Sequence, residues 1–405
     1  MSKNPHSDQE VPTPDDAGRE TAQPGIPYWD PRSDAVQKDQ IAAYDQMRRS
    51  CPLAQSQYGY TSVFRHADVL RVVQDHDTFS NAVSRFPSVP NGMDPPEHTP
   101  LRRLIEPYFD AEHMRAFEPA CREIAARLVQ TTLQADTTVE FVADFAQIFA
   151  LQAQCAWLGW PDALHEPLRQ WTLKNHRATM SRDQEAQAAV AQEFDGYIKD
   201  LLAVRRQAGD AAPKDITSHL LCNASLGRLL TEEEIISILR NWTVGELGTI
   251  AASIGILAHY LAIHPDIQRQ MRDDRKLLPA AIDEILRIHA PLIMNRRVTT
   301  RDTELGGYRL PAGTRIAALW ASANRDESIF GDSDEFRLDR DPALNLLYGA
   351  GIHVCPGAPL ARLELLAVMD AILTGTTWLA LNREHRPVNA CYPGSGFSSL
   401  FIDIQ

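Results

Sequence analysis

The feature that most constrains the fold is one long apolar segment, residues 231–265, with the sequence TEEEIISILRNWTVGELGTIAASIGILAHYLAIHP. Thr231 and Glu234 make a capping box at its start. His264-Pro265 ends it, because the residue before a proline is disfavoured in the helical region. A helix of this length spans roughly 45–50 Å at 1.5 Å per residue, the width of a whole domain. It is apolar on most sides, so we expect it to run through the middle of the fold.

The rest of the chain is expected to be mostly helical, with a few short strands. The segments with helical periodicity are residues 40–51, 66–76, 278–288 and most of 115–207, with a break at 157–161. A strand is expected within residues 58–64. Residues 297–320 alternate in polarity and carry the turn signals Gly306-Gly307 and Pro311-Ala312-Gly313, which is typical of hairpins. The sequence therefore predicts a mainly α fold with a minor β region.

The 405 residues show no shift in composition that would mark a linker in the middle of the chain. We therefore expect residues 34–405 to form a single catalytic domain. Residues 1–33 are rich in Pro, Asp, Gln and Ser, which predicts a disordered or loosely packed arm.

Charge and hydropathy narrow the possible partners. The net charge is −13, and no basic run of the kind that binds nucleic acid occurs. No apolar stretch reaches the length of a membrane span without polar interruption, and the N-terminus lacks a basic-then-apolar signal pattern. We expect a cytoplasmic protein with no nucleic-acid partner and no membrane partner.

One cysteine stands out among the six of the chain. Cys355 lies in YGAGIHVCPGAPLAR, residues 348–362, where glycines surround it and Pro356-Gly357 lead into a helical pattern. Glycines remove side chains where something large lies against the backbone. The positive end of a helix dipole favours a thiolate. The stretch is interpreted as a thiolate presented on a tight loop, although a nucleophile or a buried free thiol would explain this motif taken alone.

This loop resembles the cysteine loop of the cytochrome P450 haem-thiolate monooxygenases of the soluble bacterial type, with further matches over residues 40–405. The family pattern is Phe-x-x-Gly-x-His/Arg-x-Cys-x-Gly, and here Tyr348, Gly351, His353, Cys355 and Gly357 occupy it, with Tyr in place of Phe. The resemblance implies a triangular helical domain with a long central helix over the haem. It implies haem b as cofactor, Cys355 as the iron ligand, and Tyr348 and Gly357 beside the haem.

The resemblance also implies a set of side chains that hold the two haem propionates. His98 and Arg102, in DPPEHTPLRR, are four residues apart and would project together from a helix that begins near His98. Arg297 in NRRVTT and His353 complete the set, with Arg296 as a rival to Arg297. Four cationic or donor side chains suit two carboxylates.

A further match is Glu284-Ile285-Leu286-Arg287, in which Glu284 and Arg287 share one helical face. In the family, such a pair forms a buried network with an arginine of a later meander. That arginine is here expected to be Arg340 in EFRLDR. The role of these three residues is structural.

The long helix departs from the family pattern Ala-Gly-x-Asp/Glu-Thr. Without gaps, GELGT falls on this pattern, so that Thr249 matches the threonine while Gly248 replaces the acid. Glu246 and Thr249 are three residues apart on one face. We hypothesise that Glu246 substitutes as a proton relay, or that it anchors a polar substrate. The alternatives are that Glu246 pairs with another helix and that Thr249 only bonds a carbonyl of its own helix.

The substrate pocket is assigned by resemblance alone. Its candidates are Val244, Leu292, Ile293, Met294, Asn295 and Phe397. The expected reaction inserts one oxygen atom of O₂ into a small or medium organic molecule, by hydroxylation or oxidative demethylation. Electrons would come from NAD(P)H through ferredoxin reductase and ferredoxin. The missing acid at Gly248 keeps a peroxide-driven or O₂-independent haem enzyme as the alternative, and a haem carrier or sensor is the non-enzyme one.

Overall fold

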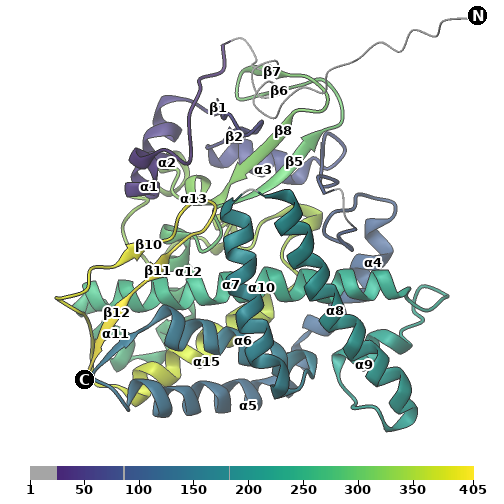
Figure 1. Cartoon of the computed structure of the whole chain (residues 1–405). Helices are drawn as coiled ribbons and strands as arrows, with labels where there is room; N and C mark the ends of the chain where they lie inside the picture. Colours follow the sequence, from purple (N-terminus) through teal and green to yellow (C-terminus); the bar gives the residue numbers. More distant parts are fainter. Residues whose placement is uncertain (1–24, 85–86, 182) are drawn as a thin grey trace, which may run out of the picture.

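A computed structural model describes residues 25–84, 87–181 and 183–405. Most of these residues are helical (Figure 1). The helices are α1 Asp34–Lys38, α2 Gln40–Ser50, α3 His66–Gln74, α4 His98–Ile105, α5 Ala111–Leu128, α6 Gln147–Leu158, α7 His165–Ser181, α8 Gln184–Ala208, α9 Ile216–Cys222, α10 Glu232–Ile263, α11 Pro265–Asp273, α12 Leu278–His289, α13 Trp320–Ala323, α14 Glu327–Phe330 and α15 Ala358–Gly375.

The strands form four small sheets in the described residues. The strands are β1 Leu53–Gln55, β2 Thr61–Val63, β3 Phe79–Ser80, β4 Thr138–Glu140, β5 Met294–Thr299, β6 Thr303–Leu305, β7 Tyr308–Leu310, β8 Arg315–Leu319, β9 Leu379–Leu381, β10 Val388–Asn389, β11 Phe397–Ser399 and β12 Phe401–Ile404. Strands β1, β2 and β5–β8 lie at the top of Figure 1, and β10, β11 and β12 lie at its left. The largest sheet has the order β1-β2-β8-β5-β3, and a second has the order β4-β12-β9. The predicted mainly α fold with a minor β region is confirmed.

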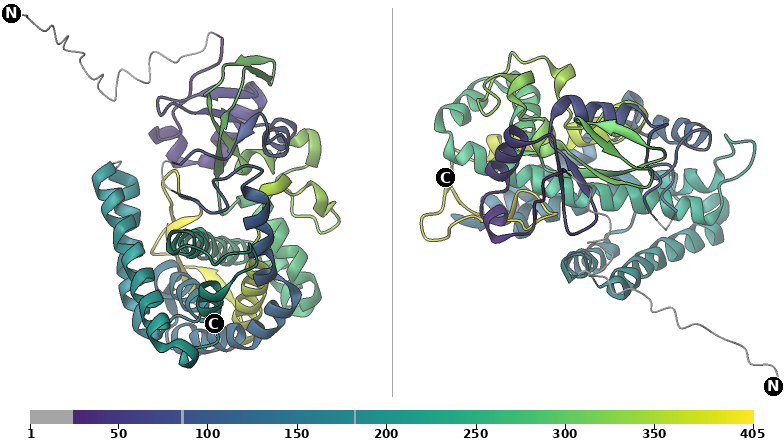
Figure 2. Two further views of the ribbon diagram at one scale, coloured as in Figure 1. Left: turned by 90° about the vertical axis from the view of Figure 1, so that its right-hand side faces the viewer. Right: turned by 90° about the horizontal axis from the view of Figure 1, so that it is seen from above.

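Helix α10 is the predicted long central helix. Thr231 accepts a hydrogen bond from the Glu234 backbone, and the Glu234 side chain accepts one from the Thr231 backbone. The helix ends at Ile263, directly before His264. It crosses the molecule beside α6, α8, α12 and α15, and Figure 2 shows it enclosed by other elements. This central position explains why α10 is apolar on most sides.

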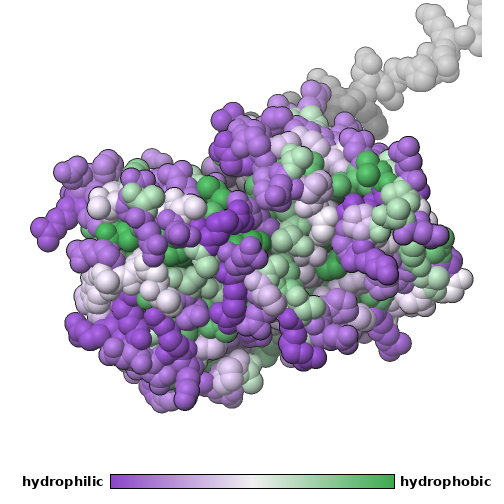
Figure 3. Space-filling model, turned by 90° about the horizontal axis from the view of Figure 1, so that it is seen from below, coloured by the Kyte–Doolittle hydropathy of each residue, from purple (hydrophilic) through white to green (hydrophobic). Residues whose placement is uncertain are grey.

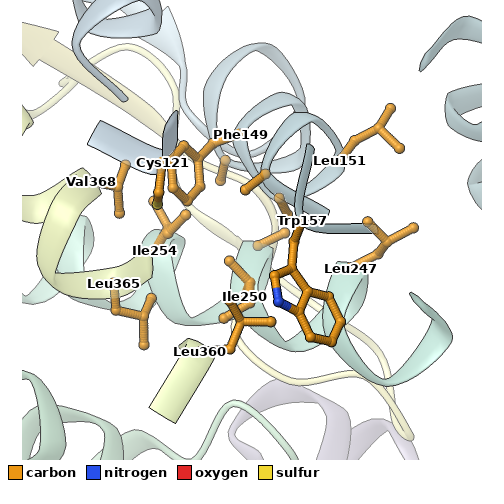
Figure 4. Packing of buried hydrophobic residues seen from close by; sticks show 14 of the residues in the cluster. Cys121, Phe149, Leu151, Trp157, Leu247, Ile250, Ile254, Leu360, Leu365 and Val368 are labelled. Carbon is orange, nitrogen blue, oxygen red and sulfur yellow. The ribbon is translucent and has the colours of Figure 1, made fainter. Parts of the chain in front are cut away.

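The core around α10 is made of aliphatic and aromatic side chains from four helices. Figure 4 shows Ile250 and Ile254 of α10 packed with Phe149 and Trp157 of α6 and Leu365 of α15. Burying such side chains contributes about 1.5–3 kcal/mol each. Helix α10 is long and apolar enough to cross a membrane, but 61% of its most apolar window is buried inside the protein. The face shown in Figure 3 is mostly hydrophilic. We conclude that α10 is a core helix.

Residues 115–207 are mostly helical, as predicted. The short strand β4 within them was not foreseen, because its partner β12 lies near the far end of the chain and leaves no local signal. The expected arm ends earlier than residue 33. Trp29 is buried against Tyr44 and Phe64, and its indole donates to Ser62. Burial of the single residue Trp29 thus orders a segment whose polar composition predicted a loose arm. Residues 1–24 lie outside the described part of the chain.

Candidate functional site

The loop before α15 holds Cys355 by backbone hydrogen bonds. The Cys355 N–H donates to the carbonyl of Tyr348 over 2.8 Å, and Gly349 and Gly351 adopt φ angles of 75° and 71°, which favour glycine. A Cβ on Gly351 would overlap the carbonyl oxygen of Val73. The two glycines therefore let the loop turn tightly against α3.

Gly357 keeps the space beside the sulfur free. A Cβ at this position would lie 3.8 Å from the Cys355 sulfur. The Gly357 and Ala358 N–H groups point at the sulfur and lower the pKa of the thiol, but burial has the larger effect and raises it. The helix terminus thus favours the thiolate, as expected, but burial outweighs this effect in the structure. A coordinating metal ion would deprotonate the thiol outright.

Cys355 lies on the wall of a cavity of about 530 Å³. The predicted site residues among its lining are Thr249, Leu292, Met294, Asn295, Arg297, Tyr348, His353 and Cys355. We call this space the thiol cavity. The sequence analysis missed Trp320, which lines the thiol cavity and whose indole donates to the Asn295 amide oxygen over 3.2 Å. No local pattern marks this tryptophan, because it reaches the site from the end of β8.

Three predicted pocket residues do not line the thiol cavity. Ile293 and Phe397 line a different cavity, because alternation along an extended segment sends Ile293 to the opposite side from Leu292 and Met294. The Phe397 ring packs on His259, with ring centroids 4.5 Å apart. Val244 is 43% exposed on α10 and lines neither cavity. The substrate-contact predictions for these three residues do not hold in this geometry.

The predicted propionate residues gather beside the thiol cavity. The rings of His98 and His353 lie 4.4 Å apart, and the Nε2 atom of each is buried without a hydrogen-bond partner in the described structure. Burial lowers the pKa of Arg297 to about 10, and burial together with His98 and Arg297 lowers that of His353 to about 3. Buried donors without acceptors are costly, so this cluster suits an anionic ligand.

The other two arginines near this cluster, Arg102 and Arg296, are less deeply buried than Arg297. Arg102 donates to Glu106 over 2.9 Å on its own helix. Arg296 is exposed and reaches Tyr60 over 3.3 Å, whereas the neighbouring Arg297 is only 3% exposed. Of the two rivals, Arg297 is the one buried with the histidines.

The residues of the E-x-x-R match meet in the buried interior. Glu284 accepts hydrogen bonds from Arg287 over 2.7 Å and from Arg340 over 2.9 Å. Arg287 also donates to the Asn324 carbonyl over 2.6 Å. The carboxylate thus faces two cations, and α12 is fastened to the segment that precedes the cysteine loop.

Thr249 and Glu246 face different surroundings. The Thr249 side chain lines the thiol cavity, and its hydroxyl donates to the Gly245 carbonyl over 2.8 Å. Glu246 does not line that cavity, so it is no substrate anchor there. Its carboxyl group lies beside that of Glu364 of α15. Pairing with another helix is the alternative that this geometry favours.

Glu364 was missed by the sequence analysis. It is fully buried, and its carboxyl oxygens have no partner in the described structure apart from Glu246. Gln154 of α6, with its amide nitrogen turned to Glu246, donates to both carboxyl oxygens over 3.0 Å. Burial raises the pKa of both glutamates. The available signal was an acid within the apolar run LARLELLAVMD, but without the fold nothing linked it to Glu246.

Comparison with known proteins decides the family. The family described as Cytochrome P450 matches residues 161–393. The putative cytochrome P450 YjiB of Bacillus subtilis is 31% identical over 82% of this chain and 86% of its own length. The erythromycin C-12 hydroxylase of Saccharopolyspora erythraea is 30% identical over 84% of this chain and 87% of its own length. The chain belongs to the cytochrome P450 family.

The fold of this P450 agrees with solved structures. Cytochrome P450 CYP109Q5 from Chondromyces apiculatus superimposes with a TM-score of 0.84 at 28% identity, over 93% of this chain and 98% of that one. P450 EryK in complex with erythromycin B gives a TM-score of 0.82 at 28% identity, over 91% and 97%. The protein is a monooxygenase that uses haem and acts on small organic molecules. Its relatives are hydroxylases and epoxidases, and nothing favours the peroxide-driven alternative.

The residues of the thiol cavity fit a haem. The thiol supplies a ligand for iron, and the glycine at position 357 leaves room beside the sulfur. The unpartnered His98 and His353 nitrogens, together with buried Arg297, supply donors for carboxylates. The P450 therefore has both an iron ligand and an anion-binding cluster on one cavity.

Proposed function

We propose that Cys355 is the axial ligand of a haem b that occupies the thiol cavity. The observation that carries this proposal is a thiol on the cavity wall beside two buried imidazoles that lack hydrogen-bond partners. Bound haem supplies the activation of O₂ and the transfer of one oxygen atom to the substrate. The Gly357 and Ala358 N–H groups would lower the electron density on the sulfur and thereby tune the iron.

His98, Arg102, Arg297 and His353 would hold the haem propionates. In this arrangement the two imidazoles act as donors, and the Arg297 guanidinium supplies the charge that is most deeply buried. A carboxylate at this place would raise the pKa of His353, because an adjacent anion favours the protonated imidazole. The carboxylates and the donors would then satisfy each other, and the cost of burying the donors would be removed.

The substrate would lie between Thr249 of α10, the segment 291–295 and Trp320. Leu292 and Met294 give this wall an apolar surface, while Asn295, held by the Trp320 indole, places one amide toward the cavity. Such a wall suits a small or medium organic molecule with at least one polar group. The relatives include a hydroxylase/epoxidase of mycinamicin IV and a hydroxylase of erythromycin, so hydroxylation is the reaction we favour over oxidative demethylation.

Glu246 and Glu364 would form the proton store that position 248 cannot provide. Two carboxyl groups in contact inside a protein cannot both ionise easily, so the pair holds a proton at neutral pH. That proton would lie between the carboxyl groups of Glu246 on α10 and Glu364 on α15, one turn of α10 before Thr249. The pair would release its proton toward the Thr249 hydroxyl, which lines the thiol cavity, and would then take up another proton from solvent.

Electrons would reach the protein from NAD(P)H through ferredoxin reductase and ferredoxin, with ferredoxin bound on the face beside the cysteine loop. Val354, which precedes the proposed ligand, is 39% exposed there, and the nearby Arg103 and Arg362 are exposed cations. An acidic, iron–sulfur electron carrier suits such a surface. We place the protein in the cytoplasm, where these carriers operate.

The first experiment is a spin-state titration of the purified ferric holoprotein. Neutral aromatics, terpenoids, acids and amines are added class by class, and haem absorbance is recorded. We expect one class to produce a low-to-high-spin shift. That compound is then incubated with reduced ferredoxin under O₂, and separately with peroxide. Product formed with ferredoxin supports the proposal, whereas product formed with peroxide alone would overturn the proposed electron route.

The proton store is tested with Glu246→Gln and Glu364→Gln, with Glu123→Gln on the exposed face of α5 as the matched control. We expect both buried variants to keep their haem and to form less product per NAD(P)H consumed, by about 10- to 100-fold. The solvent isotope effect on the product formed per NAD(P)H consumed should also be larger in these variants than in the parent protein. Unchanged coupling of electron consumption to product in both variants would exclude the pair from proton delivery.

A further inference from the structure

A second cavity of about 310 Å³ lies on the far side of the segment that borders the thiol cavity. Helix α10 contributes Thr249 and Ser253 to the thiol cavity, and then Ile256 and His259 to the second one. Ile293 faces the second cavity, whereas its neighbour Leu292 faces the first. The remaining walls come from α2, the end of α12, and the β10–β11 hairpin, which lies at the left of Figure 1. The two cavities therefore share two walls.

Two histidines in this second cavity lack hydrogen-bond partners. His259 and His289 make no hydrogen bond or ion pair within the described parts of the chain. Their ring contacts are to Phe397 over 4.5 Å and to Tyr260 over 5.4 Å. Burial lowers the pKa of each to about 4, so both are neutral at pH 7. A neutral imidazole carries one donor and one acceptor, so each of these two cavity-lining histidines has both groups available for a ligand.

Three other polar side chains around the cavity have hydrogen-bond partners. The Tyr44 hydroxyl donates to Gln40 over 2.9 Å, and Gln40 donates to the Ala390 carbonyl over 2.7 Å. The Ser395 hydroxyl donates to the Ala290 carbonyl over 2.5 Å. The two histidines differ from these three neighbours, because their rings form no hydrogen bond in the described structure.

A cation at the rim can attract an anion. Lys38 is exposed at the rim and forms no ion pair among the described residues. Its neighbour Asp39 also lies at the rim, where its carboxylate accepts from the Ala42 N–H over 3.0 Å. Arg287 and Arg325 disfavour protonation of His289, but Glu284 and Asp45 neutralise these two cations.

We propose that this second cavity binds a small carboxylate with an apolar body. The carboxylate accepts hydrogen bonds from the His259 and His289 imidazoles, and Lys38 at the rim attracts it. The apolar body packs on Ile256, Ile293 and Phe397. The volume is at the lower end of the range for ligand pockets, which fits one small ring or a short chain.

An occupant of this cavity would touch the walls of the thiol cavity from behind. A ligand whose carboxylate binds His259 contacts α10 two to three turns beyond Thr249. The apolar body of the same ligand contacts Ile293, next to Leu292. Binding in either cavity then changes the affinity of the other, and the two effects are equal by linkage. The second cavity is accordingly an effector site for the monooxygenase.

The test uses holoprotein whose iron carries 4-phenylimidazole, so that the thiol cavity is filled. Benzoate is titrated by calorimetry, with benzyl alcohol as its neutral counterpart, and haem absorbance reports whether the azole stays bound. The variants are His259→Phe and His289→Phe. The control is His385→Phe, which changes an exposed histidine that is also stacked on a ring, that of Phe401.

We expect one benzoate to bind per chain while the azole stays on the iron. Both cavity variants weaken binding by at least about tenfold, benzyl alcohol binds at least about tenfold more weakly than benzoate, and the control matches the parent protein. If a cavity variant fails to fold, Lys38→Gln at the exposed rim should still weaken benzoate binding, by about twofold to fivefold. Absence of binding, displacement of the azole, or equal affinity in the histidine variants would overturn the proposal.

Discussion

The cysteine loop with its supporting network and the middle of α10 face one cavity, yet they treat buried charge in opposite ways. Glu284 lies between Arg287 and Arg340, so its carboxylate is neutralised by two cations. Glu246 instead lies against Glu364, and neither carboxyl forms an ion pair in the described structure. An opposite charge keeps a buried carboxyl ionised, whereas a like charge makes it retain a proton.

This difference separates a structural element from one that can take part in chemistry. The first arrangement holds α12 and the segment before the cysteine loop together. The second carries a proton that can leave, because its pKa lies well above that of an ordinary glutamate. Each prediction below changes a single residue in one of these two regions, beginning with the change of largest effect.

Removing the proposed iron ligand should abolish activity. Cys355→Ala takes away the thiol while leaving the glycines and the backbone hydrogen bond to Tyr348 intact. We expect no detectable turnover and no thiolate signature in the ferrous carbonyl spectrum. Cys222→Ala, at an exposed cysteine, is the control and should retain both. A thiolate-type spectrum in the first variant would mean that another residue binds the iron.

Breaking the ion-pair network around Glu284 should cause the largest loss of stability. Arg287→Ala leaves Glu284 buried with only Arg340, and breaking a buried ion pair costs about 3–5 kcal/mol. Arg337→Ala is the control, because it removes only an exposed pair with Asp339, which is worth at most about 1 kcal/mol. Urea unfolding of the two variants measures the difference. Equal midpoints would show that the buried network adds little to the fold.

The conformation of the cysteine loop is tested by Gly351→Ala. The substitution meets both a left-handed φ of 71° and the Val73 carbonyl, so we expect a cost of about 2–3 kcal/mol and reduced haem content. Gly307→Ala has a φ of 82° but nothing within 4 Å of the added carbon, so it reports the backbone strain alone, about 1–2 kcal/mol. The comparison fails if both variants lose the same stability and the same amount of haem.

Local patterns were enough to predict the elements on which the fold depends. Helix α10 has a capping box at one end and a His-Pro pair at the other, so its limits follow from adjacent residues. The β6–β7 hairpin follows from Gly306-Gly307 in the same way. Strand β4 could not be found, because the residues that make it a strand lie in β12.

The candidate site likewise contains residues that lie close together in the sequence and residues that only the fold brings together. Cys355 and its glycines are close in sequence, so their pattern identified them together. The contact of Glu246 with Glu364 joins residues 118 positions apart, and the direction of the Glu246 side chain depends on how α10 is rotated against α15. Helical spacing placed Glu246 and Thr249 on one face, but that face is broad enough for one residue to line the cavity and the other to be buried.

The change that bears most directly on the comparison is the pH dependence of stability in Glu246→Gln. Burial raises the pKa of Glu246 to about 8. In the unfolded chain the same carboxyl loses its proton near pH 4.5. Between these values the native state binds more protons than the unfolded state, so the stability of the parent protein falls as pH rises. A glutamine cannot ionise, and this penalty disappears from the variant.

The variant should therefore gain stability relative to the parent as pH rises from 5 to 8, by at most about 1.4 kcal/mol per pH unit. The nearest other titratable group is Glu364, whose pKa is raised well above the ordinary value by burial and by Glu246, so the variant reports on the pair. Cys121, Cys355 and Tyr348 have raised pKa values that keep them neutral in this window. Urea unfolding at several pH values measures the gain, with Glu123→Gln as the exposed control. Parallel curves for all three proteins would mean that the glutamate pair holds no extra proton, and α10 would then resemble the network around Glu284.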